Sequence, residues 1–332
     1  MILNAGNVFR HGCNHWGTSG RHADEAHSLC HSIEYKSKAS VILTTFAEVR
    51  RGIKTLSRHG DIELIITDVD GTLLNSKQEL TPQVFDAIKR ADEAGVPLMI
   101  ATGKAVGPWI YNSGILDLPQ LSGSMPQLFL QGLYIRDSKG GTLHSQTLSF
   151  SVIMEAMGMA DEHGLSFVIY CHDRILCRER NAHVDRLVFY GEPKPEAMEF
   201  SDLVREVESL DVYKVMFMGD DDQIRAIRPT ATNAFSGKAS LTSALSGMLE
   251  ILPIGASKGA GVRLVLEKMG ISPERCLALG DGENDVEMLR LCGLSVAMGN
   301  AVSKTKDVAD VIAPSNDEHG VAYAIEKYVL QK

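Results

Sequence analysis

Two aspartates one residue apart, Asp68 and Asp70, follow an apolar β-branched run in the stretch IITDVDGTLLN at residues 65–75. Gly71 and Thr72 come next, and this pair indicates that the chain reverses directly after a strand. The two aspartates raise the question of which chemistry needs two carboxylates at the tip of a strand. The simpler alternative is a strand that ends in an acidic turn without catalytic value.

A calcium loop of the EF-hand type is excluded by the residues around this pair. Asp68, Asp70, Thr72 and Glu79 stand at positions one, three, five and twelve of such a loop. Leu73 occupies position six, where the loop requires glycine, and a predicted strand precedes the segment instead of a helix.

Two weaker signals follow later in the chain. In IATGK, Thr102 and Gly103 end a predicted strand, where a hydroxyl and free backbone N–H groups can hold a phosphate oxygen. In GASKGAG, Lys258 begins a predicted helix, and the glycines around it lack the spacing of a dinucleotide-binding loop. Taken alone, Thr-Gly is a common turn and a lysine at a helix start is usually solvated.

The stretch LALGDGENDVEML adds a second acidic strand tip. Two glycines bracket Asp281, Asp285 follows four residues later, and Asn284 stands beside it at the start of a predicted helix. The dipole of that helix favours carboxylates at its first turn, which explains one acid as an N-cap. An N-cap does not explain four polar residues on one strand tip, namely Asp281, Glu283, Asn284 and Asp285.

The elements that carry these residues indicate an α/β fold. From Glu63 onward, the runs ELIIT, VPLMIAT, RCLALGD, LSVAMG and ADVIAP read as strands, and helical patterns such as TPQVFDAIKRADEAG separate them. This alternation predicts a Rossmann-like parallel sheet with helices on both faces. Such sheets bind ligands at the carboxyl ends of their strands, where Asp68, Asp70, Thr102 and Asp281 fall.

Residues 147–247 have a different pattern of predicted secondary structure. SFVIY, DRLVFY and VYKVMFMG are rich in strand-forming residues, and FSVIMEAMGMADEHG is a helical pattern between them. We expect an inserted α+β domain here. The predicted organisation is a leader at 1–60, a core made of 61–146 and 248–332, and the insertion at 147–247.

The leader differs in composition from the rest of the chain. Its first 22 residues contain no acid, which is typical of a transit peptide or a disordered leader, with an untargeted extension as the equal alternative. The segment 46–58 has helical spacing, and the histidines and cysteines at 11, 13, 15, 30 and 31 match no usual zinc pattern.

Overall composition narrows the function classes. A net charge of −9 argues against a nucleic-acid partner, and no apolar run has the roughly 20 residues of a membrane helix. With 44% hydrophobic and 23% charged residues, we expect a soluble globular protein. Six cysteines in 332 residues favour a reducing compartment over a disulfide framework.

The order and spacing of the four motifs, which carry Asp68, Thr102, Lys258 and Asp281, resemble the haloacid dehalogenase-like hydrolase superfamily. The match is to its Cof-type members (class IIB), whose cap lies between the second and third motifs, and it covers about residues 61–332. More narrowly, the segments ATGK, LQGLYI, GEPKPE, MLEILPIGASKG and SNDEHGVA are similar to the hydrolase region fused to plant plastid endoribonucleases of the rRNA-maturation type.

The chain departs from these relatives at two places. The nuclease metal site reads H-x3-H-x5-H, and here His27 and His31 are followed by Ser37 in the third place, so we expect no nuclease activity. Many Cof-type proteins carry an Asn-Gly-Ala turn where this chain has LQGL, with Gln131 in the place of the asparagine. The substrate of such relatives is therefore not carried over.

The resemblance implies a role for each motif. Asp68 would attack phosphorus and become an aspartyl-phosphate, and Asp70 would protonate the leaving alcohol and then activate water. The carboxylate of Asp68, the backbone carbonyl of Asp70 and Asp281 would bind Mg²⁺, with Asp285 holding that shell directly or through a water molecule. Thr102, Gly103 and Lys258 would contact the phosphate, with Thr102 and Lys258 neutralising its charge. Asn284 would contact either the phosphate or the metal shell.

These roles predict a Mg²⁺-dependent phosphatase of a small phosphomonoester, such as a sugar phosphate, flavin mononucleotide or pyridoxal phosphate. The alternatives are a phosphosugar mutase of the same cap class and a non-catalytic accessory protein in plastid RNA processing. We expect a small phosphorylated metabolite as partner and neither nucleic acid nor membrane. The expected location is intracellular, in the plastid or otherwise the cytoplasm.

Overall fold

A computed structural model of the chain describes residues 62–118, 125–137 and 139–331. The predicted leader, its helix at 46–58 and its histidines lie outside the described residues. In the described part of the chain, no helix combines the length and the apolar character needed to cross a membrane.

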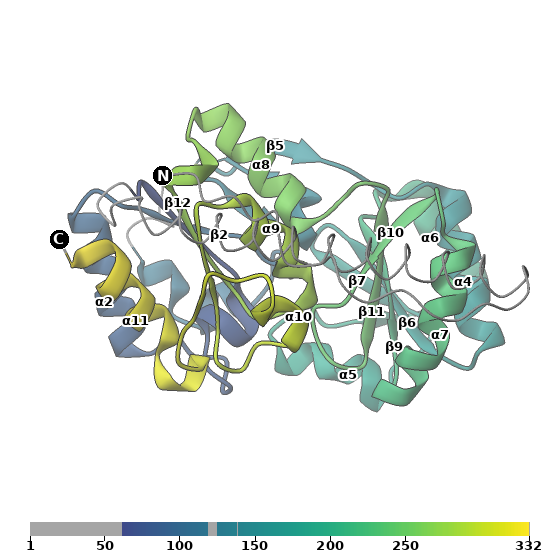
Figure 1. Cartoon of the computed structure of the whole chain (residues 1–332). Helices are drawn as coiled ribbons and strands as arrows, with labels where there is room; N and C mark the ends of the chain where they lie inside the picture. Colours follow the sequence, from purple (N-terminus) through teal and green to yellow (C-terminus); the bar gives the residue numbers. More distant parts are fainter. Residues whose placement is uncertain (1–61, 119–124, 138, 332) are drawn as a thin grey trace, which may run out of the picture. The chain divides into compact units, whose positions relative to one another are not determined.

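A five-stranded parallel sheet carries the two acidic strand tips (Figure 1). The strand order is β14-β13-β12-β1-β2, and every pairing is parallel. The strands β1 and β12 are central and fully buried, as in sheets covered on both faces. The bounds are Leu64–Thr67 (β1), Leu98–Ile100 (β2), Cys276–Gly280 (β12), Leu294–Ala297 (β13) and Val311–Ile312 (β14).

Helices cover both faces of this sheet (Figure 1). Side chains of one face, such as Ile65 and Leu277, pack with α2 and α11, and those of the other, such as Ile66 and Ala278, pack with α8 and α9. The predicted α/β fold with helices on both faces is therefore confirmed. The bounds are Pro82–Glu93 (α2), Lys258–Met269 (α8), Val286–Leu291 (α9), Ser303–Lys306 (α10) and Gly320–Ile325 (α11).

Local signals set the limits of the helix α2. Thr81 is the N-cap residue and Pro82 the first helical residue, as predicted, because the missing N–H of proline costs nothing there. The helix ends at Glu93, and Gly95 follows in the left-handed region with φ 83°. Glycine adopts this conformation without steric penalty.

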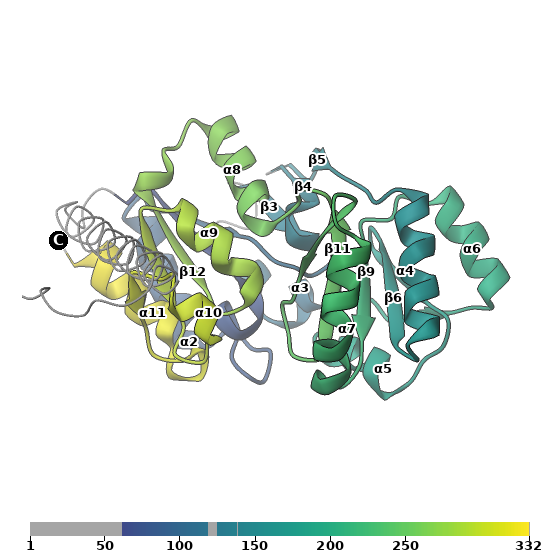
Figure 2. The same ribbon diagram turned by 45° about the vertical axis from the view of Figure 1, so that its right-hand side comes forward.

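A second, six-stranded sheet is built from the middle of the chain, in the order β10-β11-β9-β6-β7-β8. Its strands are Ser166–Cys171 (β6), Arg174–Cys177 (β7), Glu196–Ala197 (β8), Lys214–Met218 (β9), Ala239–Thr242 (β10) and Met248–Pro253 (β11). Its helices are Phe150–Glu162 (α4), Ala182–Phe189 (α5), Phe200–Ser209 (α6) and Asp221–Ala234 (α7). Figure 2 shows α4 and α7 beside β6, β9 and β11.

The two faces of this sheet differ. Alternate residues such as Val215 and Phe217 on β9 pack with α4, α6 and α7. The residues between them, Lys214, Met216 and Met218, point the opposite way because side chains alternate along a strand. The second face therefore combines charged and apolar side chains.

Two expectations for this region differ from the structure. DRLVFY was expected to be β-rich but lies in the helix α5, because the side chain of Asn181 accepts hydrogen bonds from the N–H groups of His183 and Val184. Val184 and Leu187 then share the buried face of that helix. The six-stranded sheet also includes β11, so it extends past residue 247; the division into core and insertion itself stays a prediction.

Two smaller pieces complete the described fold. A three-stranded sheet in the order β3-β4-β5 is joined to the end of β2 by the bridge between Ala101 and Leu128. Its strands are Gln127–Phe129 (β3), Tyr134–Arg136 (β4) and Thr142–Ser145 (β5), and the short helix α3 spans Trp109–Asn112.

Candidate active site

Asp68 is the first residue after β1, and a tight turn over Val69–Leu73 follows it, in which Asp70 and Gly71 are not helical. The turn contains Gly71 with φ 72°, in the left-handed region. A Cβ atom at Gly71 would collide with the carboxylate of Asp281. Glycine is therefore needed here both for its backbone conformation and for the close approach of the two strand tips.

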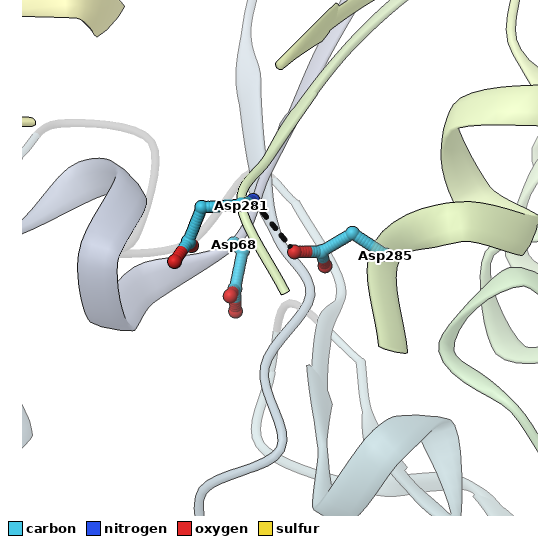
Figure 3. Close-up of side chains that lie close together, drawn as sticks. All are labelled: Asp68, Asp281 and Asp285. Atoms are coloured by element: carbon cyan, nitrogen blue, oxygen red, sulfur yellow. Dashed lines mark hydrogen bonds between the residues drawn. The ribbon is translucent and has the colours of Figure 1, made fainter. Parts of the chain in front are cut away.

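The parallel register brings the second acidic tip beside the first. β1 pairs with β12 so that Thr67 lies opposite Leu279, and the next residues along each strand reach the same edge. Figure 3 shows Asp68, Asp281 and Asp285 close together. One carboxylate oxygen from each lies within 4.8 Å of the others. Three of the four aspartates that sequence analysis assigned to the metal site thus meet at one point.

Lys258 lies between two of these carboxylates. Its Nζ atom is 2.7 Å from Oδ1 of Asp68 and 2.6 Å from Oδ1 of Asp285, and its side chain is fully buried. Lys258 is the first residue of α8, and the hydroxyl of Ser257 caps that helix. Burial acts to lower the pKa of the Lys258 ammonium, but the carboxylates of Asp285 and Asp68 outweigh it and raise this pKa above its ordinary value.

The remaining negative charge at this point is not balanced by Lys258 alone. Burial, followed by the nearby charge of Asp285, raises the pKa of Asp68 to about 7, against the opposing effect of Lys258. Burial and the charges of Asp68 and Asp285 also raise the pKa of Asp281 well above its ordinary value. Crowded carboxylates with raised pKa values and only oxygen donors fit a divalent cation such as Mg²⁺.

Asp285 already has hydrogen-bond donors on both of its carboxylate oxygens. Oδ1 accepts from Lys258, and Oδ2 accepts from the backbone N–H groups of Asp281 and Gly282 at 2.9 Å each. Oδ1 of Asp281 in turn accepts from the hydroxyl of Thr72 at 2.7 Å. Asp285 therefore holds the loop that presents Asp281, whatever further contact it makes.

Asp70 is paired with a lysine to which sequence analysis gave no role. The Nζ atom of Lys104 lies 2.7 Å from Oδ1 of Asp70 and 3.3 Å from the side-chain oxygen of Gln78. It also lies over the rings of Trp109 and Tyr190, at 5.4 and 5.6 Å from their centroids. The signal was present in the sequence, since Lys104 directly follows the Thr-Gly pair of IATGK.

Thr102 and Gly103 occupy the loop after β2. Thr102 is fully buried, and its Oγ1 accepts from the backbone N–H of Lys104 at 3.1 Å. Gly103 lines a cavity, and its carbonyl oxygen accepts from Nζ of Lys214 at 2.8 Å. Asn284 lines the same cavity.

The cavity lies between the acidic strand tips and the six-stranded sheet. Its lining on the side of the strand tips is Asp68, Asp70, Gly103, Lys104 and Asn284. The remainder is Tyr170, Leu187, Tyr190, Glu192, Lys214, Met216, Ala244, Leu245, Met248 and Glu250. Lys258 and Thr102 are not among the lining residues, although Lys258 contacts Asp68 directly.

Besides Lys104, three further buried charged residues of this cavity were missed by sequence analysis. They are Glu192, Lys214 and Glu250, with 6%, 1% and 2% of their surface exposed. The last two were detectable as single charges inside the apolar strands VYKVMFMG and MLEILP. A charge in a buried strand is rare without a partner or a function.

Glu192 contacts the loop that carries Lys104. Its Oε2 accepts from the backbone N–H of Ala105 at 3.1 Å, and its Oε1 accepts from the hydroxyl of Tyr170 at 3.4 Å. Burial raises the pKa of Glu192 to about 7, although Lys104 and Lys214 act to lower it. This carboxyl therefore titrates near neutral pH inside the cavity.

The comparison with protein families decides the membership of the chain. A profile described as haloacid dehalogenase-like hydrolase matches residues 65–325, which include all four motifs. The chain belongs to the haloacid dehalogenase-like hydrolases. It is therefore an enzyme of a hydrolase family, and the resemblance drawn from Asp68, Thr102, Lys258 and Asp281 is confirmed.

Individual relatives agree with this membership. The chain is 30% identical over 272 residues to the 5-amino-6-(5-phospho-D-ribitylamino)uracil phosphatase YcsE of Bacillus subtilis, covering 81% of this chain and 97% of the relative. A crystal structure of a haloacid dehalogenase-like hydrolase from Bacteroides thetaiotaomicron superimposes with a TM-score of 0.69 at 28% identity, covering 80% of this chain and 99% of that one.

A plant relative has a different name. The chain is 39% identical over 272 residues to the chloroplastic endoribonuclease YBEY of Arabidopsis thaliana, and the match covers 80% of this chain. It spans only 46% of the plant protein, which is about half its length. The name of that protein describes a longer chain than the part matched here.

Proposed function

We propose that this hydrolase is a Mg²⁺-dependent phosphatase that cleaves a small phosphomonoester through an aspartyl-phosphate on Asp68. One observation carries the proposal: Asp68 lines the cavity with its Oδ1 on the Lys258 ammonium and two further carboxylates beside it. Phosphoryl transfer needs a nucleophile, neutralisation of phosphate charge and a proton donor for the leaving oxygen. Each of these has a candidate side chain at this cavity.

Asp68 supplies the nucleophile in this proposal. One of its carboxylate oxygens would attack phosphorus, the bond from phosphorus to the leaving alkoxide would break, and water would later cleave the acyl phosphate. Nζ of Lys258 lies 2.7 Å from Oδ1 of Asp68, and this contact fixes the direction in which the carboxylate attacks. The anion is the reactive form, so this ammonium and a bound cation both favour it.

Asp70 supplies the proton in this proposal. It would protonate the leaving oxygen and afterwards accept a proton from the attacking water, as a general acid–base group. Lys104 holds its Oδ1 at 2.7 Å, and the second oxygen remains available to the substrate. Both residues line the cavity.

The carboxylates of Asp68 and Asp281 and the backbone carbonyl of Asp70 would hold Mg²⁺, because hard cations take oxygen ligands. A bound Mg²⁺ neutralises phosphate charge and keeps carboxylates ionised. Asp285 supports this set by holding the Asp281 loop and Lys258. Lys258, Gly103, Asn284 and the hydroxyl of Thr102 are the proposed contacts of the phosphate oxygens.

The six-stranded sheet and its helices are proposed to act as the cap. Its mixed charged and apolar face closes the cavity above the strand tips, which limits the leaving group to a small molecule. A sugar phosphate, flavin mononucleotide and pyridoxal phosphate are the substrate classes to test first. Relatives of this chain include a phosphatase of a small phosphorylated metabolite, which supports the proposal.

The experiment is a screen of phosphorylated metabolites with the purified protein and Mg²⁺. Release of inorganic phosphate from a small ester, with wild-type activity lost in Asp68→Asn, is the expected result. An isomerised sugar without phosphate release would identify a phosphosugar mutase instead. Turnover of no ester on the panel, including p-nitrophenyl phosphate, would favour a non-catalytic accessory protein.

The location of the protein is a separate proposal. The acid-free start of the chain and the chloroplastic plant relative both point to a plastid, with the cytoplasm as the alternative. A fusion of residues 1–60 with a fluorescent protein tests this. Accumulation in plastids is expected, and a diffuse cytosolic signal would contradict it.

A further inference from the structure

Four buried polar side chains form a continuous line of hydrogen bonds. The line runs from the six-stranded sheet to the loop after β12, which carries Asn284. Nζ of Lys214 lies 3.1 Å from Oε1 of Glu250, and Nε2 of Gln131 donates to Oε2 of Glu250 at 2.9 Å. Nδ2 of Asn284 donates to Oε1 of Gln131 at 3.1 Å. None of the four side chains belongs to the acid cluster around Asp68.

The chemistry of one end of this line dictates the orientation of the other. Glu250 is paired with Lys214, and an ionised carboxylate only accepts hydrogen bonds. Gln131 must therefore turn its NH₂ group toward Glu250 and its oxygen toward Asn284. Asn284 must then present an N–H to Gln131, which leaves its Oδ1 without a hydrogen-bond partner among the described residues.

The same line also reaches the loop after β2. Lys214 donates a second hydrogen bond to the carbonyl oxygen of Gly103. Gln131 packs directly against Gly103, because a Cβ atom there would lie 2.5 Å from its Nε2. The backbone of Gln131 is left-handed with φ 62°, a conformation that a residue with a side chain keeps only when its surroundings hold it.

We propose that Gln131 is a positioning residue, which passes the orientation set by the Lys214–Glu250 pair to the amide of Asn284. The six-stranded sheet would thereby be coupled to Asn284 and Gly103. The consequence for phosphate binding rests on the proposed function, in which these two residues contact the phosphate. The coupling of the six-stranded sheet to Asn284 and Gly103 does not rest on the proposed function.

A double-mutant cycle tests whether Gln131 acts through Asn284. The variants are Gln131→Leu, Asn284→Ala and the double variant, and the measurement is calorimetric titration with inorganic phosphate in the presence of Mg²⁺. We expect Gln131→Leu to weaken phosphate binding about 10-fold in the wild-type background, a coupling typical of residues in contact. In the Asn284→Ala background the same change should cost less than about 2-fold. Equal losses in both backgrounds would overturn the proposal.

Two further variants control for a general loss of structure. Gln131→Asn keeps the amide but is one methylene too short to reach both Glu250 and Asn284. It should therefore weaken phosphate binding as Gln131→Leu does. It replaces Gln131→Leu in the test if that variant does not fold. Gln146→Leu is the matched change at a glutamine whose side chain, among the described residues, makes a single long hydrogen bond of 3.4 Å to a backbone carbonyl. It should leave phosphate binding within about 2-fold of wild type.

Hydrogen exchange separates failure of this inference from failure of the proposed function. Gln131→Leu should speed exchange of the backbone amides at residues 282–286 about 10-fold, and Gln146→Leu should not. If the wild-type protein cleaves no phosphate ester but this difference appears, the phosphatase proposal fails and the positioning role stands. If exchange is unchanged in Gln131→Leu, Gln131 does not position Asn284.

Discussion

Nζ of Lys104 lies 2.7 Å from Oδ1 of Asp70, and both side chains line the cavity that contains Asp68. Lys104 is 3% exposed and also lies over two aromatic rings, so its position is held by packing as well as by charge. A proton carrier works only within hydrogen-bond reach of the reacting oxygen. In the proposed mechanism, this pairing therefore makes Lys104 a positioning residue for Asp70.

We predict that Lys104→Met lowers kcat with p-nitrophenyl phosphate by about 10- to 100-fold, the usual effect of a misplaced catalytic group. Lys104→Arg should retain more activity, because it keeps the positive charge beside Asp70. The measurement is steady-state kinetics with a melting temperature for each variant. Wild-type kcat in a folded Lys104→Met protein would show that Asp70 is held by other contacts.

The two aspartates should fail in different ways. Asp68→Asn lacks the nucleophile, so it should show no turnover and no covalent phosphate. Asp70→Asn should lower the rate by about 10²- to 10⁴-fold, the usual contribution of general acid–base catalysis. Because breakdown of the acyl phosphate would also be slowed, quenched samples of Asp70→Asn should contain protein heavier by one phosphoryl group. A phosphorylated Asp68→Asn protein would place the nucleophile elsewhere.

The acidic strand tips were predictable because local signals and topology agree there. Asp68 and Asp281 each follow an apolar run, and parallel strands bring their carboxyl ends to one edge. Any order of those strands within the sheet would have placed both residues on that edge. The motif spacing then identified the family without knowledge of the strand order.

The opposite wall of the cavity was not predictable in the same way. Glu192, Lys214 and Glu250 lie far apart in sequence, and their meeting depends on the register of β9 with β11 and on a loop after α5. DRLVFY shows a related limit, since the N-cap Asn181 and burial on one helical face prevail over β-propensity. Gln131 was noted only as a departure from a family turn, and its partners became visible only in three dimensions.

Glu192 predicts a pH dependence of stability. Burial raises its pKa from the ordinary value of 4.5 to about 7. The folded state therefore binds this proton more tightly than the unfolded state, so the contribution of Glu192 to stability is complete below pH 4.5 and is lost as pH rises to about 7. The loss should be on the order of 3 kcal/mol, from the free energy of a pKa shift of this size.

Urea unfolding at pH 5 and pH 8 measures this effect. Glu192→Gln has no proton to lose, so its unfolding free energy should fall less between the two pH values than that of the wild type. Glu162→Gln, an exposed change on α4, should follow the wild type. Identical pH dependence of Glu192→Gln and wild type would mean that Glu192 titrates at its ordinary pKa in the folded protein.

Removal of the metal ion should abolish turnover, and metal affinity should depend on pH. The raised pKa values of Asp68, to about 7, and of Asp281 mean that protons compete with a cation for these carboxylates below neutral pH. Mg²⁺ binding measured by calorimetry should therefore weaken from pH 8 to pH 6 and release protons to the buffer. Asp281→Asn should weaken the binding at both pH values, whereas an Asp317→Asn change on the surface should not. Turnover that persists after treatment with a chelator, or Mg²⁺ affinity that does not change with pH, would contradict the assignment of these carboxylates as its ligands.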